Sequence, residues 1–324
     1  MMKLVSWTPA LLLGMLLSGM QLEPAWSQTP VFPKRPIEMT VPFGAGNAAD
    51  VTGRYLAEGM AKRLGVAVPV INRPGAGGAV AFTHVVQQPA DGYSVGYITT
   101  SISTSYYSGN MSFDYKAFAP VARVTIETPA LVVRADAPWR TLKEMVDDAK
   151  SNPGKFRIGN SGTGTHTHLS ASALFLGAGA KVIDVPFGGG DATLHLLGGR
   201  LEGVVQLPPA LISHVKGGTL RALAVLGSRR DSILPDTPTA TELGFGVALD
   251  LWRGIVVPKG TPPVAIKKLE EAIRLTVESP EFQEAGVKVG FLPAFLPASE
   301  FGQLIAEDDA KLASVMAELG LKTR

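Results

Sequence analysis

Glycines with the spacing of a phosphate-binding turn lie early in the chain, in TVPFGAGNAAD at residues 40–50. Gly44, Gly46 and Ala49 fit the fingerprint G-x-G-x-x-G/A, in which glycines let the backbone approach a pyrophosphate at a helix N-terminus. That fingerprint also needs an acidic residue at the end of the second strand, to hold the ribose. The segment VAVPVINRPG ends instead in Asn72 and Arg73, which disfavours NAD. Arg73 could still read a 2′-phosphate, so a phosphorylated dinucleotide remains an alternative.

A second glycine-rich turn, SGTGTHTH at residues 161–168, follows the apolar segment FRIGN. In an open α/β sheet, ligands lie beyond the carboxyl ends of the strands, where helix N-termini carry partial positive charge. Two such turns that face each other across a cleft would hold a small anion from both sides, because glycines leave the main-chain amides accessible. The alternative is that these glycines only allow strand and helix to pack tightly.

Polar side chains in the two turns could add further donors. Asp50 is expected near the start of the first helix, where a carboxylate stabilises the exposed N–H groups. Alternatively, Asp50 bonds directly to an amino or hydroxyl group of the ligand. Ser161, Thr163 and Thr165 supply hydroxyl groups to the second turn.

Two histidines, His166 and His168, stand at the expected start of the helix after the second turn. We expect one of them to donate a hydrogen bond to the ligand, with local capping as the alternative. A metal site is disfavoured because a strand, not a helix start, brings two such histidines together and no third ligand is evident. Asp191 or His195 could supply a third metal ligand only if the fold brought one of them close to the two histidines. We therefore predict no metal.

Catalytic patterns are weak throughout the chain. GNSGTG fails as a nucleophile elbow, because Thr163 occupies the position of the second glycine in G-x-S-x-G. The sequence contains no cysteine, no H-E-x-x-H motif and no P-loop lysine. Serine hydrolysis by Ser161 with His168 or His195 remains an alternative. We predict a protein that is not an enzyme and that needs no cofactor.

Composition and the N-terminus indicate an exported globular protein. The 324 residues are 46% hydrophobic and 18% charged with a net charge of +2, and the scattered basic residues disfavour nucleic-acid binding. A basic start, the apolar segment ALLLGMLLSGM and the small residues AWS predict a signal peptide cleaved near Ser27/Gln28, with an uncleaved membrane anchor as the alternative. Without cysteine, neither a lipoprotein anchor nor a disulfide framework is possible, which suits the periplasm.

The order of apolar segments predicts two similar α/β lobes. A strand at 37–43, a glycine turn and a helix that ends at Gly65 are followed by another strand, glycine turn and helix, and this pattern restarts at 156–160. Such alternation predicts, in each lobe, a mainly parallel sheet flanked by helices.

The segments between the two patterns predict the domain organisation. After the signal peptide at 1–27, lobe 1 is expected to comprise 28–131 plus 251–324, and lobe 2 to comprise 132–250. The chain then crosses twice between the lobes, which makes a hinge and places the site in the cleft. Because one pair of lobes forms a complete clasp, we expect a monomer.

Ordered blocks along nearly the whole chain resemble the solute receptors of tripartite tricarboxylate transporters, the Bug/TctC family. These blocks are FPKRPIEMTVPFGAG, INRPGAGGAVA, PADGYSV, NPGKFRIGNSGTGTHTHLSA, VPFGGGDATLHLLGGRLE, LRALAVLGSRRDSILPDTPTATELGF and WRGIVVPKGTPP. The resemblance implies a two-lobed periplasmic binding protein of the Venus-flytrap type (type II). It also implies a small carboxylate ligand and delivery of that ligand to a membrane permease.

The resemblance maps the family's two anion loops and their neighbouring strand ends onto this chain. Together with His166, the predicted ligand-binding residues are Phe43, Gly44, Ala45, Gly46, Asn47, Asp50, Thr100, Ser101, Ser161, Gly162, Thr163, Gly164, Thr165, His168, Phe187, Gly188 and Asp191. Asn47 stands where the family usually has a second glycine, and Phe187 where it often has tyrosine. These departures leave the identity of the carboxylate open. An orphan sensor for a signalling partner and an exported enzyme on the same scaffold are the alternative functions.

Overall fold

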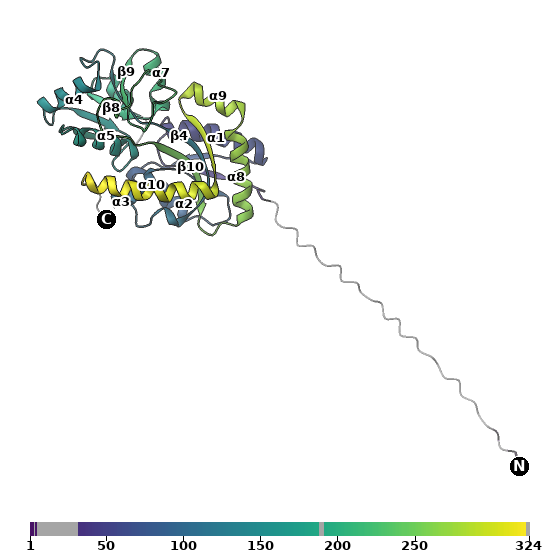
Figure 1. Ribbon diagram of the computed structural model, residues 1–324. Coiled ribbons are helices and arrows are strands. Elements are labelled where there is room, and N and C mark those ends of the chain that lie inside the picture. The colour runs from purple at the N-terminus through teal and green to yellow at the C-terminus, as the bar shows by residue number, and fades with distance from the viewer. Residues whose placement is uncertain (3, 5–31, 188–190, 322–324) are drawn as a thin grey trace. The chain divides into compact units, whose positions relative to one another are not determined.

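The computed structural model describes residues 1, 2, 4, 32–187 and 191–321. The predicted signal peptide and the predicted ligand contact of Gly188 lie outside these residues. Residues 32–324 form one compact unit, shown as the coloured ribbon in Figure 1. Across 32–187 and 191–321, no helix is both long enough and apolar enough to span a membrane.

The first of two sheets has six strands in the order β11-β4-β10-β3-β1-β2. Its strands are β1 (Glu38–Val41), β2 (Val70–Asn72), β3 (Ser94–Thr99), β4 (Phe118–Glu127), β10 (Leu251–Pro258) and β11 (Leu292–Pro297). β1 pairs in parallel with β2 and β3, whereas β10 is antiparallel to β3 and β4, and β11 is antiparallel to β4. We call this sheet with its helices lobe 1.

Helices cover both faces of the first sheet. Their bounds are α1 (Ala48–Leu64), α8 (Pro263–Val277) and α9 (Pro280–Val289) on one face, and α2 (Ala79–Val86), α3 (Ser101–Tyr107) and α10 (Ala298–Glu318) on the other. Short 3₁₀ turns are η1 (Ala76–Gly78) and η2 (Tyr115–Ala117). Fully buried Leu56 and Leu269 pack against Met39 and Ile255 of the sheet. Burial of one such leucine stabilises the fold by about 1.5–3 kcal/mol.

The second sheet has five strands in the order β7-β6-β8-β5-β9 and, with its helices, forms lobe 2. Its strands are β5 (Ala130–Arg134), β6 (Arg157–Asn160), β7 (Ile183–Pro186), β8 (Gly203–Gln206) and β9 (Leu220–Val225). Two hydrophobic cores hold its helices on the sheet. The first includes α4 (Leu142–Ser151) and α5 (His166–Gly177), and the second includes α6 (Ala192–Leu197) and α7 (Ile212–Lys216). The 3₁₀ turn η3 (Pro208–Ala210) lies between β8 and α7.

Both sheets are mixed, which corrects the expectation of mainly parallel sheets. The parallel pairs are those of the strand, glycine turn and helix units, β1 with β2 and β3, and β6 with β7 and β8. The antiparallel pairs involve β4, β5 and β10, where the chain leaves one sheet and later returns to it. The repeated sequence pattern detects parallel crossovers only, because a strand that is not followed by a turn and helix carries no such mark.

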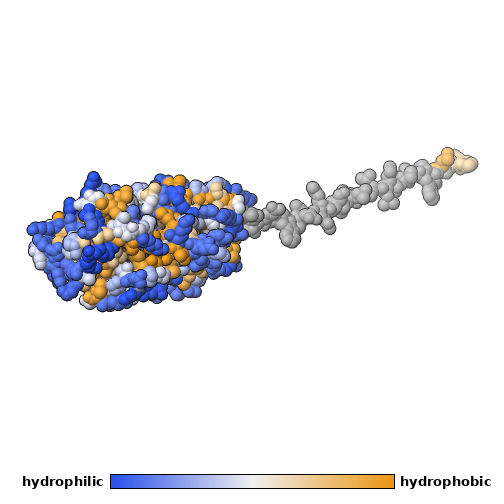
Figure 2. All heavy atoms as spheres, turned by 90° about the horizontal axis from the view of Figure 1, so that it is seen from above, coloured by the Kyte–Doolittle hydropathy of each residue, from blue (hydrophilic) through white to orange (hydrophobic). Residues whose placement is uncertain are grey.

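The surface of the folded unit mixes hydrophilic and apolar side chains. Figure 2 shows one face, on which hydrophilic residues cover the margins and apolar residues gather along the middle. Large exposed apolar residues such as Val80, Leu194 and Val287 come from separate elements. Single residues of this kind are normal on a globular protein.

Candidate functional site

The first glycine turn is fixed by side chains at the start of α1. Asn47 is the N-cap, and its Oδ1 accepts a hydrogen bond of 3.0 Å from the Ala49 amide. Asp50, buried in the first helical turn, accepts from the Gly46 amide at 3.0 Å and from Asn72 at 2.9 Å. Burial alone would raise the pKa of Asp50, but hydrogen bonds from Arg54, Gly46 and Asn72 hold it below its usual value. Asp50 thus orders the turn, and its contact with a ligand stays a prediction.

The second glycine turn is held in a similar way at the start of α5. Thr165 is the N-cap, and its hydroxyl accepts from the His168 amide at 3.3 Å. Two turn amides donate to side chains: Ser161 to Thr167 at 3.0 Å, and Gly162 to Asn160 at 2.8 Å. Gly162 and Gly164 have φ of +122° and +77°, a backbone region in which other residues are strained. The turn therefore depends on glycine for its backbone shape, in addition to the predicted access of a ligand to its main-chain amides.

A cavity of about 240 Å³ lies between the second glycine turn and the turn at 75–78, and Phe43, just before the first glycine turn, also lines it. Its lining consists of Phe43, Gly75, Ala76, Gly77, Gly78, Asn110, Ser161, Gly162 and Thr163. A Cβ on Gly77 would lie 2.8 Å from the carbonyl oxygen of Thr163, and the Thr104 hydroxyl donates to the Gly164 carbonyl. Lobe 1 and lobe 2 therefore touch at this cavity, which we call the cleft cavity.

Sequence reasoning missed part of the cleft cavity. The turn at 75–78 was recognised only as a glycine turn, and Asn110 was not considered. Gln206, at the end of β8, is fully buried and its Oε1 accepts from the Ser161 hydroxyl at 3.0 Å, while its Nε2 has no partner among the described residues. A glutamine that follows the apolar residues GVV in the segment LEGVVQL was the available signal, because buried polar groups are nearly always hydrogen-bonded.

A second cavity, of about 540 Å³, is lined by three of the predicted site residues. Ala45 and Gly46 line it from lobe 1, and Asp191 lines it from lobe 2. Phe187 follows β7, where its amide donates to the Asn160 carbonyl at 3.1 Å and its ring packs 4.8 Å from that of His195. The first glycine turn thus faces two cavities, with Phe43 in the cleft cavity and the next residues in this one.

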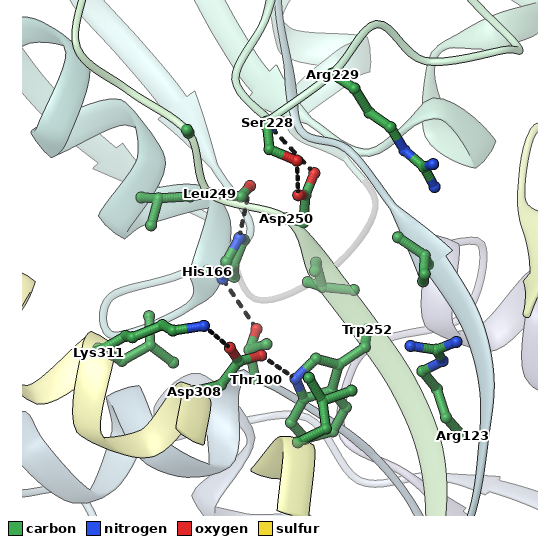
Figure 3. Close-up of a pocket in the computed structure, with 15 residues that line it drawn as sticks. Thr100, Arg123, His166, Ser228, Arg229, Leu249, Asp250, Trp252, Asp308 and Lys311 are labelled. Carbon is green, nitrogen blue, oxygen red and sulfur yellow. Dashed lines mark hydrogen bonds and ion pairs between the residues drawn. The ribbon is translucent and has the colours of Figure 1, made fainter. Parts of the chain in front are cut away.

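Thr100 and His166 lie apart from both of these cavities. They line a third cavity of about 510 Å³, which we call the hinge cavity, and the Thr100 hydroxyl lies 2.9 Å from His166 Nδ1. His166 Nε2 lies 3.2 Å from the carbonyl oxygen of Leu249 (Figure 3). Burial lowers the pKa of His166 to about 4. The amide of Ser101, the next residue, donates to Thr99 Oγ1 at 3.0 Å.

The two histidines of the HTH motif have separate partners. His168 Nδ1 accepts from the Gly164 amide at 3.2 Å, and its Nε2 lies 3.5 Å from Asp184 Oδ2. Burial raises the pKa of Asp184. Within the part of the chain that the structure describes, no three His, Asp or Glu side chains gather in a way that could hold a metal ion.

Both the sequence and the structure of this chain are similar to those of known proteins. The sequence model of the family described as "Tripartite tricarboxylate transporter family receptor" matches residues 52–321. Protein BugT of Bordetella pertussis is 32% identical, over 90% of this chain and 92% of BugT. The structure of periplasmic binding protein BugD is similar with a TM-score of 0.85 and 29% identity, over 90% of this chain and 99% of that chain. MatC from Rhodopseudomonas palustris with bound malate has a TM-score of 0.82 and 26% identity, over 88% and 99%.

Proposed function

The chain belongs to the family of tripartite tricarboxylate transporter receptors, and from this premise we propose that it captures a small carboxylate-bearing molecule between its two lobes. We propose further that the loaded receptor delivers this molecule to a tripartite tricarboxylate-type membrane permease. Members of this family are solute-binding receptors and not enzymes. The proposed location is the periplasm, with export by a cleavable N-terminal signal peptide, and the proposed form is a monomer.

The meeting of the lobe 1 turn at 75–78 with the second glycine turn supports this proposal. Phe43 and the turn at 75–78 contribute the lobe 1 side of the cleft cavity, and Ser161–Thr163 contribute the lobe 2 side. Each side lies just before a helix, α1 or α2 in lobe 1 and α5 in lobe 2, and helix N-termini favour negative charge. A carboxylate in this cavity would be stabilised from both lobes. The malate bound to MatC, a relative with the same fold, supports a carboxylate ligand.

Ser161 and Gln206 are proposed as the polar pair that orients the ligand in lobe 2. The Ser161 hydroxyl donates to Gln206, so its own lone pairs stay available to a hydroxyl group of the ligand. Gln206 Nε2, which has no partner among the described residues, is a free donor on the side chain that Ser161 contacts. A hydroxyl group of the ligand could donate to Ser161 and accept from Gln206, whereas a carboxylate oxygen could only accept from Gln206.

In the proposed domain organisation, lobe 1 comprises residues 28–131 and 251–324, and lobe 2 comprises residues 132–250. β4 ends at Glu127 in the first sheet and β5 begins at Ala130 in the second, so the chain passes between the sheets at 128–129, two residues before the proposed boundary at 131. β10 begins at Leu251, which supports the second crossover. A ligand favours closure of such lobes only through contacts that it makes better in the closed state than in the open state.

A thermal-unfolding titration tests the proposed function. Malate, succinate, citrate, benzoate and amino acids are added to protein that has been unfolded and refolded, so that no carried-over ligand remains. An acid present at 100 times its dissociation constant is expected to stabilise the protein by about 2.7 kcal/mol. Ser161→Ala should weaken that acid's binding about fivefold or more, whereas Ser213→Ala on the exposed side of α7 should not. If no acid raises the unfolding temperature, the proposal is wrong.

Gly77→Ala is expected to weaken ligand binding at least about tenfold, equivalent to about 1.4 kcal/mol. The added Cβ would lie 2.8 Å from the backbone oxygen of Thr163, which belongs to the other lobe and has no rotamer by which to move away. The nearby Ser105 hydroxyl, also at 2.8 Å, can rotate. The substitution therefore disfavours the closed arrangement in particular.

Gly65→Ala is the matched control for backbone strain. Gly65 has φ of +71°, close to the +66° of Gly77, but a Cβ there would have no atom within 4 Å. Both variants should lose some stability, and only Gly77→Ala should lose affinity in calorimetric titration with the acid identified above. Equal affinities of the two variants would refute the role of the Gly77–Thr163 contact in closure.

A further inference from the structure

The hinge cavity shares no lining residue with the cleft cavity. Its walls come from both lobes and from the segment that joins them. Arg123 and Ile126 of β4 belong to lobe 1, Ser228 and Arg229 follow β9 of lobe 2, and the segment 248–252 leads into β10. Thr100, His166 and helix α10 form the rest of the wall (Figure 3). At about 510 Å³, the cavity falls in the range of small-molecule sites.

Two arginines along one wall of the hinge cavity have no acidic partner in the part of the chain that the structure describes. In Figure 3, Arg229 extends from its loop toward Arg123, and the two guanidinium groups lie on the same side of the cavity. Arg123 is half-buried and its Nε donates to the Ala294 carbonyl at 2.9 Å. Among the described residues, no carboxylate lies within ion-pair distance of either guanidinium; Glu300 acts on Arg123 only from further away. Burial and the like charge of Arg229 lower the pKa of Arg123.

The two acidic residues that line the hinge cavity, Asp250 and Asp308, already have hydrogen-bond or ion-pair partners. Asp250 accepts from the amide and the hydroxyl of Ser228, at 3.4 and 2.5 Å. Asp308 accepts from the indole nitrogen of Trp252 at 2.6 Å and lies 3.7 Å from Lys311 Nζ. Arg123 is half-buried, Arg229 is exposed, and the charge of Arg229 acts on Arg123. An external anion between the two would offset the desolvation of Arg123 and the repulsion between the two charges.

Apolar side chains complete the hinge cavity. Trp252 comes from β10, Ile126 from β4, and Leu304 and Leu312 from α10. Trp252 and Leu312 are buried, whereas Ile126 and Leu304 are partly exposed. An anion that also carries an apolar group would cover this surface and meet the arginines at one end.

We propose that the hinge cavity is a second binding site, for a small organic acid whose carboxylate lies between Arg123 and Arg229 and whose apolar body lies against Trp252. Guanidinium groups suit a carboxylate because their planar N–H groups match its two oxygens. The site bridges the lobes, since Arg123 is in a strand of lobe 1 and Arg229 follows a strand of lobe 2. It is independent of the carboxylate proposed for the cleft cavity.

Titration with benzoate, followed by ¹H–¹⁵N spectra of the tryptophan indoles, tests this site. The Trp252 signal is identified by its loss in Trp252→Phe. Benzoate is expected to shift this signal saturably, and acetate, which lacks the apolar body, should bind at least about tenfold more weakly. A Trp252 signal that benzoate leaves unmoved would overturn the proposal, and equal binding of acetate would refute the apolar contact.

Substitutions locate the bound benzoate. Arg123→Gln and Arg229→Gln should each weaken the Trp252 response at least about tenfold. Arg230→Gln is the matched control, because the neighbouring Arg230 forms an exposed ion pair with Glu242 at 2.9 Å, and it should bind benzoate as the unmodified protein does. Ser161→Ala, in the cleft cavity, should also leave the Trp252 response intact. If both arginine variants bind normally, or if Ser161→Ala alone removes the response, benzoate does not occupy the hinge cavity and the proposal fails.

Discussion

Glu127→Gln is expected to lower the free energy of unfolding by about 3–5 kcal/mol, the usual cost of removing one partner from a buried ion pair. Glu127, at the end of β4, and Arg253, in β10, have side chains that are 0% and 1% exposed. Arg253 Nε and Nη2 donate to the two carboxylate oxygens at 2.6 and 3.0 Å. Loss of the carboxylate charge would leave the guanidinium buried without a counter-ion.

The surroundings of this pair make the loss difficult to offset. Burial by itself lowers the pKa of Arg253, but the charge and hydrogen bonds of Glu127 outweigh burial and raise the pKa above its usual value. Arg253 Nη1 has no hydrogen-bond partner among the described residues, so the guanidinium depends on Glu127. The pair lies one residue before the crossover at 128–129, where β4 leaves the first sheet. Its loss should therefore loosen the connection between the lobes as well as the sheet.

Urea unfolding of three variants measures this contribution. Glu202→Gln is the matched control, since Glu202 also accepts two hydrogen bonds from an arginine side chain, that of Arg157, and one from its backbone amide, but in an exposed pair. It should lose much less stability, because exposed ion pairs contribute little. The double variant Glu127→Leu/Arg253→Met should be more stable than Glu127→Gln, because it leaves no unpaired charge. A loss from Glu127→Gln no larger than that from Glu202→Gln would contradict this account.

The local parts of the site could be predicted from sequence. Gly46, Gly162 and Gly164 all have positive φ in turns between a strand and a helix, and such positions favour glycine whatever the rest of the fold does. Asp50 was expected near the start of the first helix, as the residue that stabilises its exposed N–H groups. Asn47 fills that role, and Asp50 holds the turn before it. Both residues satisfy N–H groups near a helix start, so sequence alone does not separate them.

The arrangement of distant residues could not be predicted in the same way. A pattern marks where a strand ends, but it does not say which strands are neighbours or on which side of the lobes a side chain emerges. Thr100 was assigned to the ligand cleft as a strand end, and His166 because it stands at the helix start after the second turn, but both line the hinge cavity. The contact of Ser161 with Gln206 joins residues 45 positions apart and depends on the pairing of β6 with β8.

His166 is expected to make the stability of the protein depend on pH between about 6.5 and 4. A carbonyl oxygen can only accept, so the Leu249 contact places the proton of the neutral ring on Nε2. His166 Nδ1 then accepts from the Thr100 hydroxyl. A second proton on Nδ1 would break that hydrogen bond and leave a charge in a site that is 1% exposed.

The sign of this dependence follows from the two pKa values of His166. Burial lowers the pKa in the folded protein to about 4, from an ordinary value of 6.5. As the pH falls from 6.5 to 4, the unfolded chain therefore binds a proton at His166 while the folded protein stays largely unprotonated there, and the free energy of unfolding decreases. The contribution of His166 is fully present above pH 6.5, and its loss by pH 4 amounts to about 3 kcal/mol.

Urea unfolding at intervals from pH 7 to pH 4 measures this loss, and His166→Gln should remove most of it. Glutamine does not titrate and can still donate to the Leu249 carbonyl, so the variant should be nearly as stable at pH 4 as at pH 7, apart from the slope that other groups contribute. His214→Gln, at the partly exposed His214 of α7, removes a histidine from elsewhere and should retain the His166 contribution. Because His166 joins Thr100 of lobe 1 to Leu249 of the segment between the lobes, acidification should weaken this connection before the cores of the lobes unfold. A wild-type slope that His166→Gln leaves unchanged would show that this histidine is not protonated on unfolding.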